Sequence, residues 1–477
     1  MPSRKLSRRD FLKSAAIAGG ALVAGGVIRH IYNTLGRNFQ PKRAKAYLES
    51  LQPGPHPETL PNIVIILCDD LGYGDLESPV VNTSNLDRMA AEGARLTSFY
   101  ASSSVCSPSR AGLLTGRYPV RTLITTPLLS TFDAMNVVMD VLGRYSYNVR
   151  GIPEDEVLLP EALKRRGYRT GLVGKWHLGD SPGHLPNDRG FDSFYGALWS
   201  NDDQPYAIYR DRQVAVPAPA EQNVLTHDFT LAAQEFIHAN QHQPFFLYLA
   251  HAMPHVPIHA SDNFRGKSAA GMYGDAVEEL DWSVGQILAT LSELGLDEKT
   301  LVFFSSDNGP WWQGNPGYAR GRKLLWFEGG YRVPLLARWP GVIPPGTVSG
   351  ASSMNFDLFT TCMQLAGIPL PQDRIIDGKD ILPMLKGEAS APHDKLFFYA
   401  VRTPVGVRYQ HWKYYRNYIT DNASFWPLHQ GPFLFDIESD PNESYSLVES
   451  QPARAAEMAA MLETCTAQMD ANLRGWL

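Results

Sequence analysis

Short apolar runs alternate with helical patterns along the chain from about residue 60. Residues 62–67 form a continuous β-branched run, which is typical of a central strand covered on both faces. A helical segment opened by Pro160 and stopped by Gly167 follows, and a further strand is expected at residues 168–173. This alternation predicts an α/β fold, in which helices cover the faces of a β-sheet.

Polar side chains follow four of the predicted strands, directly after each strand ends. The strands at residues 62–67, 168–173, 244–250 and 301–305 run into Asp69-Asp70, Gly174-Lys175-Trp176-His177, His251 and Asp307-Asn308-Gly309. Because ligands bind at the carboxyl ends of strands in open α/β sheets, these four stretches are expected to meet at one crevice. Taken singly, each ending is equally well an ordinary turn, since any strand must end in polar residues.

The character of the sequence changes after about residue 385. Short aromatic-rich segments at residues 395–400, 405–410, 413–415 and 433–437 predict a small antiparallel sheet, closed by an Ala-rich helix at residues 452–472. We place the boundary near Gly387, which predicts a main domain over residues 56–386 and a C-terminal subdomain over residues 387–477.

Residues 1–46 are interpreted as an export signal and spacer, separate from the globular fold. Arg8 and Arg9 precede a mildly apolar run at residues 15–28, which is too short for a membrane span. This pattern resembles an export signal that is recognised by the twin-arginine translocase. The alternative interpretation of the same residues is a basic arm beside an Ala-rich helix. Residues 44–46 supply a small-x-small cleavage pattern. The sequence therefore predicts a periplasmic or extracellular protein, whose signal is either cleaved or kept as a tether.

Length, charge and cysteine content narrow the classes of function. The chain has 477 residues, of which 44% are hydrophobic and 19% charged, so it can bury a large core. Its 43 Lys and Arg residues against 49 Asp and Glu residues give a net charge of −6, which disfavours a nucleic-acid partner. An anionic substrate must then be held by a local cluster of cations. Four cysteines, Cys68, Cys106, Cys362 and Cys465, are too few for a disulfide scaffold.

Cys106 lies in the most informative stretch of the sequence, residues 104–116. Pro108 suits the first turn of a helix, so Cys106 is expected at the N-terminal end of that helix, where free amides favour an anion. Arg110 follows one turn on and can face the same point. From these residues alone, Cys106 is an electropositive cysteine that is either catalytic, a thiol with a lowered pKa and no function, or a simple cap.

The run Cys106-Ser107-Pro108-Ser109-Arg110, followed by Ala-Gly-Leu-Leu-Thr-Gly-Arg, resembles the signature of the type I sulfatases. The strand-end segments, Lys323 and residues 434–443 occur in that family's order, so the resemblance extends from about residue 60 to Leu447. Between Cys106 and Asp203 the sequence is most similar to the arylsulfatase A and N-acetylgalactosamine-6-sulfatase branch. The resemblance implies an alkaline-phosphatase-like fold, with a large mixed β-sheet flanked by helices and a smaller C-terminal antiparallel sheet.

The same resemblance implies hydrolysis of a sulfate ester, either an aryl sulfate or a sulfated carbohydrate, through a modified cysteine. A formylglycine-generating maturation enzyme would oxidise Cys106 to formylglycine (3-oxoalanine). One hydroxyl of its hydrate attacks sulfur and expels the alcohol or phenol, and the second then loses a proton so that the aldehyde re-forms and sulfate leaves. A hard cation would be held by Asp69, Asp70, Cys106, Asp307 and Asn308, with Ca²⁺ the family's usual metal and Mg²⁺ the less expected one.

Cations and histidines receive their roles from the resemblance as well. Arg110 would steady the diol, while Lys175 and Lys323 would bind the sulfate oxygens. His177 would take the proton from the sulfated intermediate, and His251 would assist the leaving oxygen together with Lys323. Preorganised cations at these points are what the chemistry requires, because charge develops on the sulfate and on the leaving oxygen.

The roles of two groups of residues beside these segments remain undecided by the sequence. Arg320 and Arg322 lie next to Lys323, so the spacing leaves three cations for one role. Four further residues either form a rim that receives an aryl or sugar ring, or are core tryptophans and a solvated acidic loop: Trp199, Asp202, Trp311 and Trp312.

Two other functions remain as alternatives. A phosphoester or phosphonate hydrolase of the same superfold would be expected to have Ser or Thr as nucleophile and a His-rich two-zinc site, whereas this chain has Cys106 and oxygen ligands. An inactive, exported protein that binds sulfated glycans would be expected to lack Cys106 or one of the cations, and none is missing. The sequence therefore predicts an exported sulfatase, and leaves its natural ester and its oligomeric state open.

Overall fold

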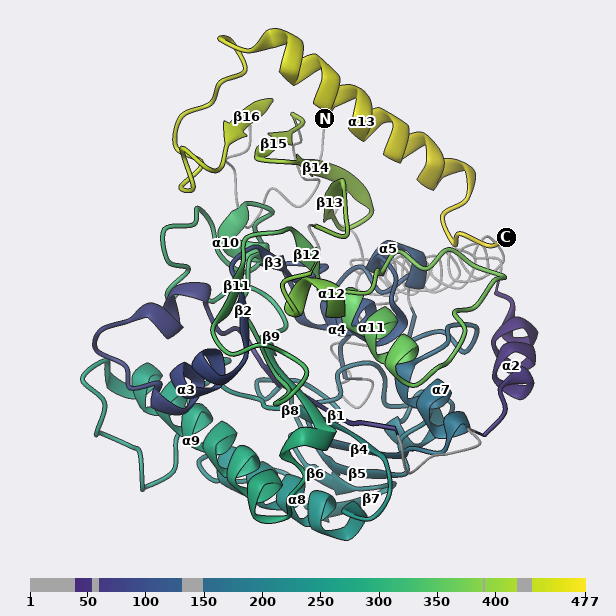
Figure 1. Cartoon of the computed structure of the whole chain (residues 1–477), viewed down its shortest axis with the longest axis vertical. Helices are drawn as coiled ribbons and strands as arrows, with labels where there is room; N and C mark the ends of the chain where they lie inside the picture. Colours follow the sequence, from purple (N-terminus) through teal and green to yellow (C-terminus); the bar gives the residue numbers. More distant parts are fainter. Residues whose placement is uncertain (1–38, 54–59, 131–148, 389–390, 418–430) are drawn as a thin grey trace, which may run out of the picture.

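The computed structural model describes residues 39–53, 60–130, 149–388, 391–417 and 431–477. The predicted twin-arginine segment lies outside the described residues. The main domain is built on ten strands: β1 (Asn62–Cys68), β2 (Ala94–Leu96), β4 (Arg169–Gly174), β5 (Ser193–Gly196), β6 (Ile208–Arg210), β7 (Gln213–Val216), β8 (Phe245–Ala250), β9 (Thr300–Ser306), β10 (Leu335–Arg338) and β11 (Thr347–Ser349). They form one mixed sheet in the order β11-β2-β10-β9-β1-β8-β4-β5-β6-β7 (Figure 1).

The centre of this sheet is parallel. β1 pairs in parallel with β8 on one side and with β9 on the other, and β8 pairs in parallel with β4. All seven residues of β1 are buried, which explains its uninterrupted apolar run. The carboxyl ends of β1, β4, β8 and β9 therefore lie at the same edge, and the predicted convergence of four sequence segments is confirmed.

Helices cover both faces of the sheet. The longer ones in the main domain are α3 (Ser84–Glu92), α4 (Cys106–Thr115), α7 (Leu159–Arg166), α8 (Leu225–Asn240), α9 (Gly271–Glu293) and α11 (Asp357–Leu365), with shorter helices α5 (Pro119–Thr122), α10 (Glu328–Tyr331) and α12 (Leu382–Leu385). Side chains of β1 alternate between the two faces. Ile63 and Ile65 pack in one core with α4, α7 and α11, whereas Val64 and Ile66 pack in the other with α8 and α9, which lie side by side (Figure 1).

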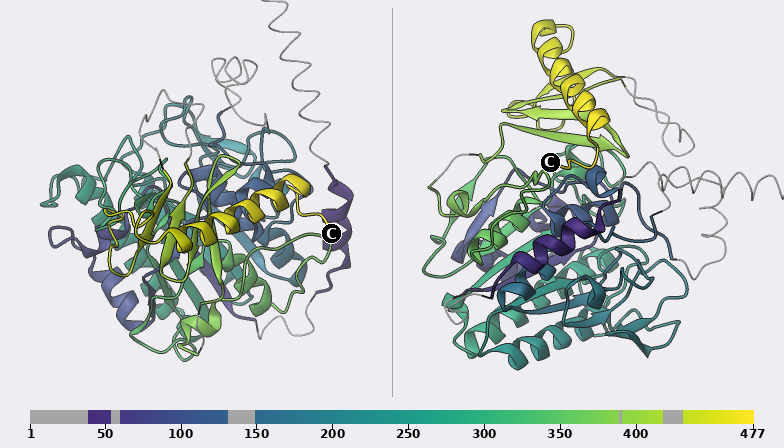
Figure 2. Two further views of the ribbon diagram at one scale, coloured as in Figure 1. Left: turned by 90° about the horizontal axis from the view of Figure 1, so that it is seen from above. Right: turned by 90° about the vertical axis from the view of Figure 1, so that its right-hand side faces the viewer.

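The C-terminal subdomain is the small antiparallel sheet expected from the sequence. Its strands are β13 (Lys395–Ala400), β14 (Thr403–Tyr409), β15 (Trp412–Tyr415) and β16 (Phe433–Asp436), in that order, and helix α13 (Pro452–Ala471) follows. The sheet lies between α13 and the main domain (Figure 2). A separate two-stranded sheet, β3 (Phe99–Tyr100) with β12 (Ser353–Met354), meets it, since Tyr100 packs edge to face on Phe398 with ring centroids 5.4 Å apart.

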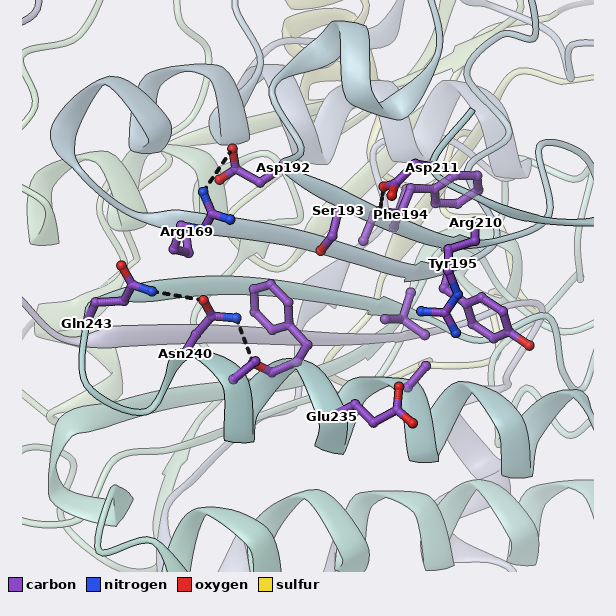
Figure 3. A pocket seen from close by; sticks show the side chains of 15 residues that line it. Arg169, Asp192, Ser193, Phe194, Tyr195, Arg210, Asp211, Glu235, Asn240 and Gln243 are labelled. Atoms are coloured by element: carbon purple, nitrogen blue, oxygen red, sulfur yellow. Dashed lines mark hydrogen bonds and ion pairs between the residues drawn. The ribbon is translucent and has the colours of Figure 1, made fainter. Parts of the chain in front are cut away.

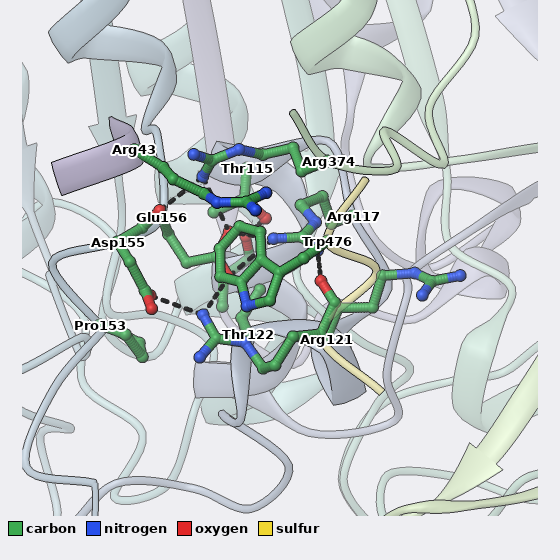
Figure 4. Close-up of polar contacts among 12 residues, drawn as sticks. Arg43, Thr115, Arg117, Arg121, Thr122, Pro153, Asp155, Glu156, Arg374 and Trp476 are labelled. Atoms are coloured by element: carbon green, nitrogen blue, oxygen red, sulfur yellow. Dashed lines mark hydrogen bonds and ion pairs between the residues drawn. The ribbon is translucent and has the colours of Figure 1, made fainter. Parts of the chain in front are cut away.

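The end of the chain returns to the main domain, where the side chain of Trp476 is buried. Four guanidinium groups surround the Trp476 ring at 4.7–5.5 Å: Arg43, Arg117, Arg374 and Arg474 (Figure 4). Acidic partners balance this charge: Arg117 donates to Glu156 at 2.7 and 2.8 Å, and Arg474 donates to the same carboxylate at 2.9 Å. The buried arginines therefore hold the C-terminal segment through paired charges and stacking.

Helix α2 (Pro41–Ser50) packs beside this segment. Arg43 donates to the Leu477 carbonyl at 3.0 Å, Tyr47 donates to the Pro369 carbonyl at 2.6 Å, and the Ala44 side chain is buried. The predicted end of the export segment, residue 46, thus falls inside a helix that contacts the main domain.

All four cysteines are free and buried, which confirms that the fold does not depend on disulfides. Among the helices within the described ranges, none combines the length and the apolar character that a membrane span needs.

Candidate active site

Four predicted metal ligands meet where β1 and β9 end. The Asp70 amide donates to Asp307 Oδ1 at 3.2 Å, and Asn308 Nδ2 donates to Asp70 Oδ1 at 2.7 Å. Asp69 adjoins them, and all four side chains are fully buried. Asp70 has φ 68°, a left-handed conformation that is unusual for a residue with a side chain and that concentrates at functional sites.

The chemistry of this cluster fits a hard cation. Asn308 Oδ1 is buried and accepts no hydrogen bond. Burial raises the pKa of Asp307 to about 7, and the adjacent Asp69 carboxylate adds to the rise. An unsatisfied amide oxygen beside crowded carboxylates is the donor set that Ca²⁺ or Mg²⁺ prefers. One ligand atom each from Asp69, Asp70, Cys106 and His255 also lies within 4.8 Å of the others.

Lys175 and Arg110 enter the same cluster. Lys175 follows β4; its Nζ donates to Asp69 Oδ2 and, at 3.0 Å, to Ser200 Oγ. Arg110, on α4, donates from Nε to Asp307 Oδ2 at 2.9 Å and from Nη1 to the Lys175 carbonyl at 3.0 Å. Both cations are fully buried, so each depends on these partners. Ser200 was not predicted, although it directly follows one of the tryptophans singled out in the sequence.

Of the three neighbouring cations that the sequence offered for one role, Lys323 is the one that reaches the site. Its Nζ donates to Asp70 Oδ2 at 2.8 Å. Arg320 and Arg322 instead donate to backbone carbonyl oxygens of other segments. The cluster thus pairs three carboxylates with three cations and is nearly neutral by itself. A bound divalent cation would make it positive, as an anionic substrate requires.

Cys106 is the first residue of α4, as expected. Its thiol donates to Asp69 Oδ1 at 3.4 Å. Burial raises the pKa of Cys106 well above its usual range, and Asp69 reinforces this because a thiolate beside a carboxylate is disfavoured. The alternative of a thiol with a lowered pKa is therefore not supported, because burial and the carboxylates outweigh the nearby lysines. Unmodified Cys106 is a poor nucleophile.

His177 holds an unpaired nitrogen at the site. Its Nε2 is 2.9 Å from the Leu128 carbonyl oxygen, which can only accept, so Nε2 carries the proton. Nδ1 is buried without a partner and keeps its lone pair. Burial lowers the pKa of His177 well below its usual range, and Lys175 adds to this, so the ring is neutral. A β-carbon at Gly174 would lie 1.9 Å from the Ala250 carbonyl oxygen, which explains the glycine before these residues.

The histidine that faces the carboxylates after β8 is His255, whereas the sequence predicted His251. His251 lies at the strand end, but its Nε2 is 3.1 Å from Ser283 Oγ on α9, and burial lowers its pKa to about 3. His255, four residues later, has its Nε2 3.7 Å from Asp70 Oδ2, and its Nδ1 is 2.9 Å from Asn201 Oδ1. The site position predicted for His251 is therefore contradicted, because the strand turns that side chain toward α9 and the following loop brings His255 back over the carboxylates.

The tryptophans divide between core and surface. Trp199 is 5% exposed and packs edge to face on His177 with ring centroids 6.0 Å apart, so the core alternative holds for it. Trp312 is 53% exposed, packs edge to face on Trp311 at 6.4 Å, and lies 5.6 Å from the Arg322 guanidinium. Asp202 is exposed. Trp312 is thus an exposed ring on the loop that begins at the metal-ligand turn.

A pocket of about 510 Å³ lies elsewhere, between the β4–β5 region and α8 (Figure 3). Arg210 covers the Tyr195 ring there at 4.6 Å, and Arg169 is 3.8 Å from Asp192. None of the predicted catalytic or metal-binding residues lines this pocket, so it is separate from the candidate site.

Known proteins resemble the chain along most of its length. The family model described as Sulfatase matches residues 61–368, and the model described as N-sulphoglucosamine sulphohydrolase, C-terminal, matches residues 318–471. N-acetylgalactosamine-6-sulfatase of Mus musculus is 43% identical over 375 residues, covering 73% of this chain and 70% of that protein. Arylsulfatase A of Bos taurus is 38% identical over 469 residues, covering 87% of this chain and 89% of that protein.

Solved structures agree with the fold. One solved structure has a TM-score of 0.77 and 26% sequence identity, and the match covers 86% of this chain and 100% of that chain. It is described with the metabolism of multiple glycosaminoglycans by Bacteroides thetaiotaomicron. Ps i-CgsB in complex with k-i-k-neocarrahexaose has a TM-score of 0.73 and 28% identity, covering 88% and 95%. Phosphonate monoester hydrolase of Agrobacterium radiobacter, at 20% identity, covers 86% and 96% and shares the fold, with a TM-score of 0.59. The expected alkaline-phosphatase-like fold is confirmed.

Proposed function

The chain belongs to the sulfatase family, and from this membership we propose that it hydrolyses a sulfate monoester through a formylglycine formed from Cys106, with Ca²⁺ bound beside it. One observation carries the proposal: Asp69 accepts hydrogen bonds from both Cys106 and Lys175. The residue to be modified, a metal ligand and a sulfate-binding cation are thereby in contact. Burial leaves the unmodified thiol protonated and a poor nucleophile, which supports a modified residue 106 as the nucleophile.

Formylglycine and Ca²⁺, which family membership implies, would supply the covalent and Lewis-acid chemistry. The formylglycine hydrate would supply a hydroxyl as the nucleophile toward sulfur, with the bond from sulfur to the leaving oxygen broken in the same step, and Ca²⁺ would supply Lewis-acid polarisation. Ca²⁺ would be held by Asp69, Asp70, Asp307 and Asn308; Mg²⁺ is the less expected metal.

The chain's own side chains bind the substrate and move protons. Lys175 and Lys323 bind the sulfate oxygens, where negative charge is concentrated. His177 accepts at Nδ1 the proton that must leave before the aldehyde re-forms. His255 presents Nε2 and assists the leaving oxygen with Lys323, the role first predicted for His251. Arg110 spans Asp307 and the Lys175 backbone, and so steadies the nucleophile's surroundings.

A sulfated carbohydrate is the substrate class we favour over a simple aryl sulfate. Among similar proteins, one is named for N-acetylgalactosamine 6-sulfate chemistry and another was solved with a neocarrahexaose. The exposed Trp312 ring, four residues after Asn308, offers a flat surface on which a sugar ring can stack. Trp312→Ala is expected to reduce kcat/KM for an oligosaccharide sulfate while sparing a small aryl sulfate.

The proposal is tested by an activity screen of matured protein. Sulfated sugars and aryl sulfates are the substrates, and a phosphate ester is the control. Release of sulfate that depends on Cys106 supports the proposal. A clear preference for the phosphate ester would favour the phosphohydrolase alternative, and binding of a sulfated glycan without turnover would favour the inactive binding protein.

We also propose that the protein acts in the periplasm or outside the cell. The support is the pair Arg8 and Arg9 ahead of the short apolar run at residues 15–28. A formylglycine-generating enzyme and the twin-arginine translocase would then be its partners in maturation and export. Since that route carries folded proteins and Cys106 is buried after folding, modification would precede export.

A further inference from the structure

The short helix α10 connects three segments of the candidate site. The Gly309 amide donates to the Gly330 carbonyl at 2.9 Å, the Gly329 amide donates to the Arg320 carbonyl at 2.7 Å, and the Ala101 amide donates to the Tyr331 carbonyl at 2.7 Å. These three bonds reach the turn after Asn308, the loop before Lys323 and the segment before Cys106, respectively. The position of α10 therefore affects a metal ligand, a sulfate-binding cation and the approach to the nucleophile.

Glu443, from the C-terminal subdomain, holds α10 in place. Its Oε2 accepts a hydrogen bond from the Glu328 amide, the first of α10, at 2.9 Å, and its Oε1 accepts one from the Tyr415 hydroxyl at 2.6 Å. The Glu443 backbone carbonyl accepts from Arg320 Nη1 at 2.9 Å. One residue of the subdomain thus contacts both α10 and the loop that carries Lys323.

The surroundings of Glu443 make this contact specific. The side chain is fully buried, and its φ of 51° is left-handed. Lys413 Nζ lies 3.8 Å from Glu443 Oε1 and pairs directly with Glu328. A buried side chain whose two oxygens accept from a backbone amide and a hydroxyl is tightly constrained, and truncation would leave those two donors unpaired.

We propose that Glu443 is a positioning residue for the reaction. It touches no group assigned to substrate or metal, and acts through α10 and Arg320 to set the positions of Asn308 and Lys323. The C-terminal subdomain is then part of the catalytic machinery, because its contact determines where a sulfate-binding cation stands. This inference rests on the proposed sulfatase activity for its readout.

The test compares matured Glu443→Ala and Glu443→Gln with Met458→Ala. Met458 is fully buried in a separate cluster with Val407 and Leu434, so its truncation weakens the same subdomain without touching α10. At a temperature where circular dichroism shows all three folded, Glu443→Ala is expected to lower kcat about tenfold or more, with a smaller change in KM. Glu443→Gln should recover most of the activity, because its amide oxygen still accepts from the Glu328 amide. Met458→Ala should keep kcat within about twofold.

Arg320→Met provides a second route if Glu443→Ala does not fold. Methionine keeps an unbranched apolar side chain at this position. It removes the guanidinium group, which lies 4.1 Å from the centre of the Phe327 ring and donates to the Glu443 carbonyl, and kcat should again fall. Unchanged kcat in Glu443→Ala or Arg320→Met, or an equal loss in Met458→Ala at a matched melting temperature, would overturn the inference. Inactive wild-type protein with complete formylglycine would instead count against the proposed function.

Discussion

Lys323 Nζ donates a hydrogen bond to the Asp70 carboxylate at 2.8 Å, across 253 residues of sequence. Both groups are largely buried, so each depends on the other for its charge. The pair joins the end of β1 to the loop after β9, and it leaves the ammonium group beside the proposed metal site. A site assembled from such pairs is organised before substrate arrives, which is what stabilisation of developing charge requires.

Cys106→Ala is expected to abolish sulfate release while leaving the fold intact. Cys106 is a small side chain at a helix end, so its loss should cost about 1 kcal/mol or less of stability. Turnover is measured on an aryl sulfate, and folding by circular dichroism. Peptide mass spectrometry of wild-type protein co-expressed with a maturation enzyme should find the aldehyde at residue 106. Full activity in protein whose Cys106 is entirely thiol would exclude the formylglycine mechanism.

Asp307→Ala is expected to lose bound Ca²⁺ and at least about a hundredfold in rate, because positioning and charge neutralisation disappear together. Metal content is measured by elemental analysis after equilibrium dialysis. Asp281→Ala is the matched control: this buried carboxylate accepts from the Asn85 and Leu86 amides and lies outside the site, so it should lower stability but keep the metal. Stoichiometric zinc, with activity restored by zinc alone, would favour the phosphohydrolase reading.

His255→Ala and His251→Ala are expected to differ in their effects on kcat and on the melting temperature. His255 faces Asp70, and its removal should lower kcat by about a hundredfold or more, as for other acid–base groups. His251 faces Ser283, so its removal should lower the melting temperature and leave kcat within a few fold. Steady-state kinetics and thermal melts decide between them. A larger kcat loss in His251→Ala would restore the role predicted from the sequence.

The stability of the protein should depend on pH through Glu443. Burial raises its pKa from 4.5 to about 7, with Lys413 opposing and Glu328 reinforcing the rise, while Tyr415 donates to it. The folded state therefore holds a proton that the unfolded state has released between about pH 4.5 and pH 7, so the free energy of unfolding falls as pH rises through this window. Glu443→Gln cannot titrate, so its free energy of unfolding should fall less steeply with pH across this window. The free energy of unfolding is measured by chemical denaturation at several pH values. An equal pH dependence in wild-type protein and Glu443→Gln would contradict this prediction.

Arg8→Lys combined with Arg9→Lys is expected to keep the enzyme inside the native host. Fractionation with an activity assay locates it, and a variant at Lys5 serves as control. Formylglycine should be present in the trapped protein, because the buried Cys106 must be modified before folding. Trapped protein holding only thiol, with aldehyde confined to exported protein, would show that modification follows export. The exported chain should begin at or before Gln40, since α2 contacts the main domain and the chain end.

Several elements could be predicted because their cause is local. The β-branched run of β1, the helix of Cys106 with Pro108 in its first turn, and the stop at Gly167 follow from side-chain shape and backbone freedom. The meeting of Asp69, Lys175 and Asp307 also followed, because parallel strands bring their carboxyl ends to one edge. The C-terminal sheet of four strands was likewise predicted from its short, closely spaced, aromatic-rich segments.

Tertiary structure decided which side chain at each strand end faces the site. The sequence identified a histidine after β8 and a cation near residue 320, but the direction of a side chain depends on the path of the loop and on what packs beside it. His251 is turned to Ser283 by α9, and the loop returns His255 to Asp70. The contacts of Ser200, Glu443 and α2 join residues far apart in the chain, and no local pattern encodes such distances. Local patterns in the sequence thus specify the helices, the strands and the reactive residue types. The packing of α9, α10 and the C-terminal subdomain selects which of those residues face the site.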